Sequence, residues 1–223
     1  LDAAKQSPSK KHIFGTDDFG RDIFSRVIVA TKVSLKVGVI SVGISLTLGT
    51  FLGAISGYYG GWIDEIIMRI MDILFAFPAI LLAIAILAAL GPGVENAMIA
   101  IGIVYTPIFA RITRGSVITV REDVYVDAAR NLGASDARII FFHILPNVIA
   151  PIIVETTLSL AFAILSEAAL SFLGLGTQPP DPSWGRMLSE SRGFIQDAPW
   201  LGVFPGLVIM LTVMGFNFLG DGL

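Results

Sequence analysis

Five long apolar runs constrain the fold of this chain more than any other feature. They cover residues 37–57, 73–90, 96–110, 148–173 and 201–219. About 20 residues at a rise of 1.5 Å each cross a hydrocarbon core of about 30 Å, so four of the runs are long enough to span a membrane as helices. The run at 96–110 is shorter. It can span the membrane only with the help of flanking residues, by a broken course, or where the bilayer is thinned. The sequence therefore predicts an all-α integral membrane protein with five transmembrane helices in this chain.

The distribution of charge favours the same fold class. Charged residues make up 15% of the chain, yet only Glu155 and Glu167 fall inside the five runs. A charge is strongly disfavoured in hydrocarbon, so membrane spans explain this pattern better than the alternative, the buried core helices of a large soluble protein. The net charge of −3 gives no indication of nucleic acid, and the expected surroundings are membrane lipid. Without cysteine, the chain has no disulfide, thiolate metal site or cysteine nucleophile.

Positive charge predicts the orientation. The link at 111–147 holds five arginines, whereas the link between the fourth and fifth runs holds only Arg186 and Arg192. The positive-inside rule places the first link in the cytoplasm and the second outside. Five spans then put the polar N-terminal segment, residues 1–36, outside although it carries seven lysines and arginines. We expect a sixth, N-terminal span upstream of Leu1 to resolve this conflict, with residues 37–223 forming the transmembrane domain.

The 111–147 link has a helical pattern of its own. Tyr125, Ala128, Ala129 and Leu132 follow i, i+3, i+4, i+7 spacing, which predicts one apolar face. Gly133 stands where a glycine with positive φ commonly ends a helix.

A second helix is expected after this glycine. Ser135 can cap its start and Pro146 can end it. The sequence thus predicts a helical hairpin with a small alanine surface, which either fits a partner's groove or packs only on its own chain.

A motif in this link resembles the cytoplasmic loop of permeases from binding-protein-dependent ABC importers, written E-A-A-x3-G-x9-I-x-L-P. Aspartate replaces the glutamate and keeps the carboxylate, and histidine replaces the isoleucine, as is typical of the peptide/nickel branch. The matching residues are Asp127, Ala128, Ala129, Gly133, His143, Ile144, Leu145 and Pro146.

Four further stretches narrow the resemblance to the peptide/nickel branch. Residues 15–22 are similar to the segment before the second span of a full-length subunit. Residues 58–62, followed by Asp72 and Pro78, are similar to its second cytoplasmic link. The fifth span and outer loop of that branch are matched by residues 167–176 and 178–185.

The resemblance implies a permease subunit that forms part of the translocation pathway for di- or oligopeptides in a bacterial or archaeal inner membrane. The implied partners are a homologous second permease subunit, two ATPase subunits and an extracytoplasmic substrate-binding protein. The chain contains no G-x-x-x-x-G-K-[ST] motif. We therefore expect no enzyme activity and no bound cofactor in this chain, with ATP and Mg on the partner ATPases. The alternatives are permeation of nickel or another small solute, and a self-contained secondary transporter or channel.

The resemblance also assigns roles to residues. Those expected to couple the permease to the ATPase are Tyr125, Asp127, Ala128, Ala129, Leu132, Gly133, His143, Leu145 and Pro146.

The two intramembrane carboxylates, Glu155 and Glu167, are candidates for the pathway, because a charge inside a span is costly. For Glu167 a hydrogen bond to a neighbouring helix is favoured over contact with substrate, and the role of Glu155 stays open. Neither His12 nor His143 has a partner at metal-ligand spacing, so no metal site is expected.

Overall fold

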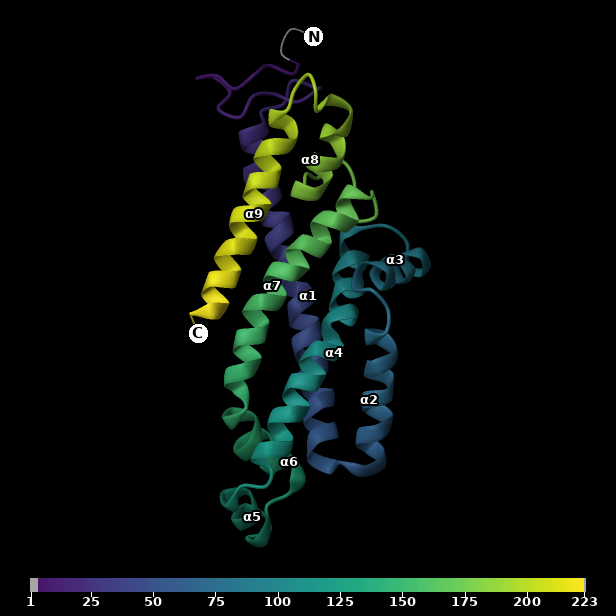
Figure 1. Ribbon diagram of the computed structural model, residues 1–223, viewed down its shortest axis with the longest axis vertical. Coiled ribbons are helices and arrows are strands. Elements are labelled where there is room, and N and C mark those ends of the chain that lie inside the picture. Colours follow the sequence, from purple (N-terminus) through teal and green to yellow (C-terminus); the bar gives the residue numbers. More distant parts are fainter. Residues whose placement is uncertain (1–3, 223) are drawn as a thin grey trace.

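The computed structural model describes residues 4–222, and its regular elements in that part of the chain are all helical. Four long helices run roughly along the long axis of the molecule, with shorter helices at both ends and along one side (Figure 1). The long helices are α1 (Ile23–Tyr59), α4 (Val94–Val120), α7 (Ile149–Phe172) and α9 (Trp200–Asp221). The shorter ones are α2 (Gly61–Phe75), α3 (Ala79–Leu90), α5 (Val124–Asn131), α6 (Asp136–Ile139), a π-helical turn (Ile140–Ile144), a 3₁₀ turn (Leu145–Asn147), α8 (Trp184–Ser191) and a second 3₁₀ turn (Arg192–Phe194).

Helices α1 and α4 form the closest pair, and glycine makes their approach possible. A Cβ atom built on Gly49, Gly53 or Gly57 would overlap atoms of α4, in each case including its backbone. The three residues are spaced by four and therefore share one helix face. Small residues at this spacing are typical of a packing seam between membrane helices, and here the seam lies against α4.

Helix α4 shows how the short third apolar run is extended to the length of a membrane span. It extends from Val94 to Val120, well beyond the apolar run at 96–110, and is long enough to cross a hydrocarbon core without a break. Its extra length comes from a C-terminal part that carries arginines toward the hairpin end.

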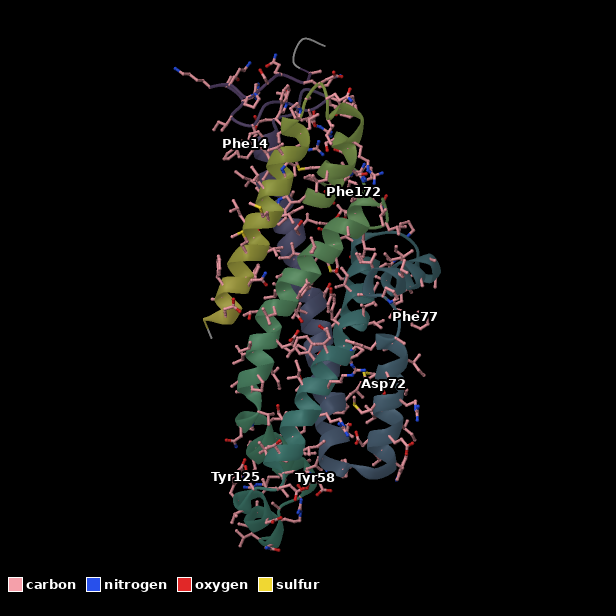
Figure 2. All side chains as sticks on the ribbon, viewed as in Figure 1. Phe14, Tyr58, Asp72, Phe77, Tyr125 and Phe172 are labelled. Atoms are coloured by element: carbon pink, nitrogen blue, oxygen red, sulfur yellow. The ribbon has the colours of Figure 1, made fainter. Side chains whose placement is uncertain are left out.

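The second span differs from the single helix expected over residues 73–90. Helix α2 ends at Phe75, α3 begins at Ala79, and the two helices meet at an angle of 94°. Pro78 explains the break, because it lacks an N–H and disfavours the helical conformation of Phe77 before it. Figure 2 shows Phe77 at this bend. Counted as one broken span, the pair brings the candidate spans in the described residues to five.

The N-terminal residues pack on the first turns of α9, where the outer loop ends, at the end of the bundle opposite α5 and α6 (Figure 1). Phe14 stacks on Phe204 with ring centroids 4.0 Å apart, and the Trp200 indole donates a hydrogen bond of 3.4 Å to the Thr16 carbonyl. Residues 4–22 and the loop that contains α8 therefore lie on the same side, as the five-span prediction requires.

Two of the basic residues in this region are neutralised locally. Arg26 forms ion pairs with Asp17 at 2.6 Å and with Glu190 at 3.0 Å, and Arg21 also pairs with Asp17 at 2.6 Å. Burial alone would raise the pKa of Asp17. The Arg21 backbone N–H and the guanidinium groups of Arg21 and Arg26 more than offset that effect, so the pKa is lowered. These paired arginines present little free positive charge, which reduces their conflict with the positive-inside rule.

Candidate functional site

The candidate site is the helical hairpin at the end of the bundle opposite the N-terminal residues. Its first arm is α5, which starts after the cap residue Asp123, and its second arm runs from α6 through the π-helical and 3₁₀ turns to Asn147. Ser135 takes the cap position of α6 as expected, but its side chain accepts no cap hydrogen bond. The predicted hairpin is therefore present, with a second arm that changes helix type along its length.

A Schellman turn joins the two arms. Gly133 has a φ of +82°, the left-handed conformation expected at this position. The Ala134 N–H donates to the Ala129 carbonyl at 3.1 Å, and the Gly133 N–H donates to the Arg130 carbonyl at 3.0 Å. This is the hydrogen-bond pair that defines the motif, and a glycine adopts its backbone without a Cβ clash.

The burial of side chains along α5 does not follow the apolar stripe that the sequence predicts. Val126, outside the predicted stripe, is fully buried, and Ala129 packs against the core of the bundle. Within the predicted stripe, Leu132 is 88% exposed, and Tyr125 and Ala128 are exposed as well. The helix thus uses Val126 and Ala129 to hold its own chain and leaves the rest of the stripe uncovered.

Side chains at the base of the hairpin fix it to the long helices. The Tyr58 hydroxyl, at the end of α1, donates a hydrogen bond of 2.8 Å to Asp136, and the Arg121 guanidinium donates one of 2.8 Å to the Gly57 carbonyl. Figure 2 shows Tyr58 and Tyr125 at this end of the molecule. The sequence reasoning missed both anchors, because each joins residues more than sixty positions apart.

Tyr125 and His143 connect the two arms of the hairpin. The Tyr125 hydroxyl donates a hydrogen bond of 3.3 Å to the His143 carbonyl, which also accepts one of 2.7 Å from Asn147. Burial and the charge of Asp123 raise the pKa of Tyr125 above its usual value, so the hydroxyl keeps its proton and remains a donor. The part of His143 that joins the two arms is its backbone carbonyl.

The second arm passes almost directly into the membrane bundle. Only Val148 separates the 3₁₀ turn at Leu145–Asn147 from α7, and Ile144 and Val148 are both buried. Pro146 lies in this turn and is exposed. The hairpin is therefore joined to α7 by a short, packed connection.

The two candidate carboxylates of α7 lie in different surroundings. Glu155 is partly exposed and accepts a hydrogen bond of 2.8 Å from Ser159, one turn away on the same helix. Glu167 is fully buried. The structure therefore does not bring the two carboxylates together as one site.

Hydroxyl groups from three segments surround Glu167. Its carboxylate accepts from Ser34 of α1 at 3.2 Å, from Ser171 of α7 at 2.7 Å and from Thr177 of the outer loop at 3.3 Å. Glu167 thus ties the outer loop to two spans and faces protein, as expected from the cost of exposing a carboxylate to lipid.

Comparison with known families gives one match that covers most of the chain. Residues 49–223 match the family described as "Binding-protein-dependent transport system inner membrane component". A dipeptide transport system permease protein, DppC, of Alkalihalophilus pseudofirmus is 59% identical over 218 residues, which are 98% of this chain and 72% of that protein. A glutathione transport system permease protein, GsiD, of Escherichia coli is 51% identical over 222 residues, which are 100% of this chain and 73% of that protein.

Solved structures share the fold. A chain of the MetNI methionine ABC transporter, in an inward-facing conformation, superposes with a TM-score of 0.73 at 17% identity. The match covers 89% of this chain and 94% of that chain. A chain of an amino acid ABC transporter superposes with a TM-score of 0.64 at 16% identity, covering 89% of this chain and 90% of that one.

Proposed function

Because this chain belongs to the family of binding-protein-dependent transport system inner membrane components, we propose that it is the permease subunit that carries di- or oligopeptides across a bacterial or archaeal inner membrane. It is a transport component, and not a catalytic one, of an ABC importer. The names of its relatives, a dipeptide permease and a glutathione permease, support a substrate with peptide bonds and free carboxylates. Nickel or another small solute is the alternative within the same branch.

The observation that carries the coupling part of this proposal is the exposed face of α5. Leu132 and Val124 are 88% and 84% exposed at the two ends of a short helix that packs on its own chain through Val126 and Ala129. Large apolar side chains so fully exposed at the end of a membrane bundle fit the groove of a protein partner. We assign this face to an ATPase subunit, with Tyr125, Ala128 and Leu132 in contact and Asp127 beside them.

The hairpin also has the mechanical connection that coupling requires. Gly133 fixes the angle between the arms, and Leu145 and Pro146 lie in the turn that passes into α7. A movement of the partner ATPase, driven by its own ATP and Mg, displaces α5 as a rigid element. The displacement reaches α7 through Val148 and changes the packing of the spans. A homologous second permease subunit and an extracytoplasmic binding protein complete the assembly.

The test is uptake by the assembled transporter. The chain is reconstituted in proteoliposomes with its second permease, ATPase and binding-protein partners, and ATP-dependent uptake of a labelled dipeptide is compared with uptake of nickel. We expect dipeptide uptake that disappears when the ATPase subunits are omitted. Uptake that persists without them would indicate a secondary transporter or channel, and uptake of nickel without peptide would contradict the substrate assignment.

A further inference from the structure

Glu167 lies where three segments meet near the outer end of the bundle. Its buried carboxylate accepts hydrogen bonds from Ser34 of α1, from Ser171 of α7 and from Thr177 of the outer loop, residues 173–199. The Ser171 hydroxyl in turn accepts a hydrogen bond of 2.9 Å from the Thr177 N–H. We refer to these four residues as the Glu167 joint, because they connect α1, α7 and the outer loop.

The Glu167 joint depends on its hydroxyl groups, since no cation neutralises the carboxylate. In the residues that the structure describes, Glu167 forms no ion pair, and its polar partners are hydroxyl groups. A buried carboxylate that loses a hydrogen-bond donor is left partly unpaired, which is more costly than the same loss at an exposed site. The same carboxylate therefore resists the separation of α1 and of the outer loop from α7.

The short helix of the outer loop, α8, is packed into the bundle next to this joint (Figure 1). Trp184 is buried at the start of α8, and its indole N–H donates a hydrogen bond of 3.2 Å to the Val27 carbonyl of α1. A Cβ atom built on Gly185 would overlap the Ala168 backbone of α7. Met187 belongs to the same buried cluster as Ala168. Helix α8 therefore cannot shift against the outer ends of α1 and α7 without losing these contacts.

Helices α1 and α7 are packed together in their outer halves and lie apart in the halves nearer the hairpin. A Cβ atom added at Gly38 would lie 3.0 Å from the Ile164 side chain, so the outer halves are in close contact. Nearer the hairpin, residues of the two helices line a groove of about 780 Å³, together with the second hairpin arm. The hairpin joins both helices at this end, through the bond from Tyr58 to Asp136 and through the short link to α7.

We propose that Glu167 is a positioning residue that makes the outer loop and α7 move as one body, so that docking of the binding protein on the outer loop changes the ATPase rate through α7. The proposal rests on the proposed function for the identity of both partners. Helix α7 has 24 residues and is about 36 Å long at 1.5 Å per residue, with the Glu167 joint near one end and the hairpin at the other. A tilt imposed at the joint therefore displaces the end that carries the hairpin.

The same connection acts in both directions. A coupling free energy between two binding sites is reciprocal, so a partner that shifts α7 from the outer loop is itself affected by a partner that shifts α7 from the hairpin. The groove leaves room for the hairpin halves of α1 and α7 to change their separation, whereas the outer halves stay joined.

Two variants open the joint without changing the carboxylate. Ser34→Ala removes the donor on α1, and Thr177→Val removes the donor on the outer loop at almost constant volume. Ser159→Ala is the matched control for the first variant, because Ser159 is also buried and donates to a carboxylate of α7, but within its own helix. Thr106→Val is the matched control for the second, because the buried Thr106 hydroxyl donates to the Gly102 carbonyl of its own helix.

Hydrogen exchange tests whether the joint holds the outer loop. It is measured on the purified transporter without nucleotide. Ser34→Ala changes α1, yet it should accelerate the exchange of amides in residues 177–191 at least threefold, because the outer loop loses its shared anchor with α1. Thr177→Val should have the same effect, and both control variants should exchange at the wild-type rate. Unchanged exchange in Ser34→Ala would overturn the proposal.

Stimulation of the ATPase tests the transmission. The ATPase rate of the transporter in proteoliposomes is measured against the concentration of binding protein loaded with a dipeptide. Ser34→Ala and Thr177→Val should lower the maximal stimulation at least threefold, while the half-saturating concentration and the basal rate stay at the wild-type values. Both controls should match wild type in all three quantities. A wild-type maximum in the two joint variants would overturn the proposal, and a raised half-saturating concentration alone would show that the joint only shapes the docking surface.

A failure of the proposed function gives a different result. A wild-type complex that takes up no dipeptide, and whose ATPase the binding protein does not stimulate, would contradict the proposed function. Hydrogen exchange requires neither activity, so it would still show whether Glu167 joins the outer loop to α1 and α7.

Discussion

Tyr58, at the end of the first long helix, donates a hydrogen bond of 2.8 Å to Asp136 at the start of the second hairpin arm. The two residues are separated by 78 positions, and their bond joins the candidate coupling site directly to α1. Arg130 lies over the same ring, with its guanidinium carbon 6.0 Å from the centroid. The position of the hairpin therefore depends on contacts across the bundle as well as on its own turn.

We expect Tyr58→Phe to weaken coupling without unfolding the bundle. A net hydrogen bond contributes about 0.5–1.5 kcal/mol, so the hairpin should move more freely and dipeptide uptake per ATP hydrolysed should fall by about two- to tenfold. Tyr59→Phe is the matched control, because the contact described for Tyr59 is a ring contact with Tyr58, and that contact is kept. An unchanged uptake ratio in Tyr58→Phe would show that this anchor has no part in coupling.

Gly133→Val should disrupt the turn between the hairpin arms. Its positive φ is unfavourable for a β-branched residue, at a cost of about 1–3 kcal/mol. The variant should still insert and pair with the second permease subunit, since position 133 lies outside the spans, but it should retain little ATPase. Gly133→Asn, which tolerates this conformation better, should recover most of the ATPase association. Equal ATPase recovery in wild type and Gly133→Val would contradict the assignment.

The two carboxylates of α7 should respond differently to amidation. Glu167→Gln replaces one of the two carboxyl oxygens around which three hydroxyl groups are arranged, and a net hydrogen bond contributes about 0.5–1.5 kcal/mol. The outer loop around Thr177 should become more sensitive to limited proteolysis, and uptake should fall. Glu155→Gln, with one serine partner on its own helix, should leave the cleavage rate close to that of wild type. Identical cleavage of the two variants would show that Glu167 does not hold the loop.

Acid should loosen the N-terminal segment through Asp17. The pKa of this carboxyl is lowered in the folded state, so its contribution to stability is present above the ordinary value of 3.8 and is lost as the pH falls through the lower, folded value. Hydrogen exchange of residues 5–23 should therefore accelerate in strongly acidic buffer. Asp17→Asn should show the fast exchange already at neutral pH, whereas Asp18→Asn should behave as wild type. Slow exchange in Asp17→Asn would rule out this ion-pair cluster as the anchor.

The sequence predicted those features that follow from local rules. Apolar runs of span length become membrane helices because lipid requires every backbone group to be satisfied within the helix. Gly133 was predictable because one residue type suits a left-handed helix end. The break at Pro78 was visible as a proline, but the 94° angle between α2 and α3 was not, because it depends on packing.

Other features depended on contacts between distant segments. Periodicity placed Ala129 on the apolar stripe of α5. In the structure Ala129 packs against the core together with Val126, because the neighbouring helices determine which side of a short helix is covered. Ala129→Glu would therefore disturb the hairpin itself as well as any partner. Helix α1 extends beyond the apolar run at 37–57 and begins at Ile23, because its first turns pack on α9 and α8 and do not need an uninterrupted apolar run.

The central claim is that the exposed face of α5 docks an ATPase, and Leu132→Glu tests it most directly. Leu132 is 88% exposed, so the substitution should leave the fold unchanged while placing an unpaired charge in the docked interface. Ile195→Glu, at a 61% exposed apolar position in the outer loop, is the control. The measurement is the amount of ATPase that copurifies with the permease pair. We predict at least a tenfold loss for Leu132→Glu and none for Ile195→Glu. Wild-type recovery of the ATPase with Leu132→Glu would contradict the account.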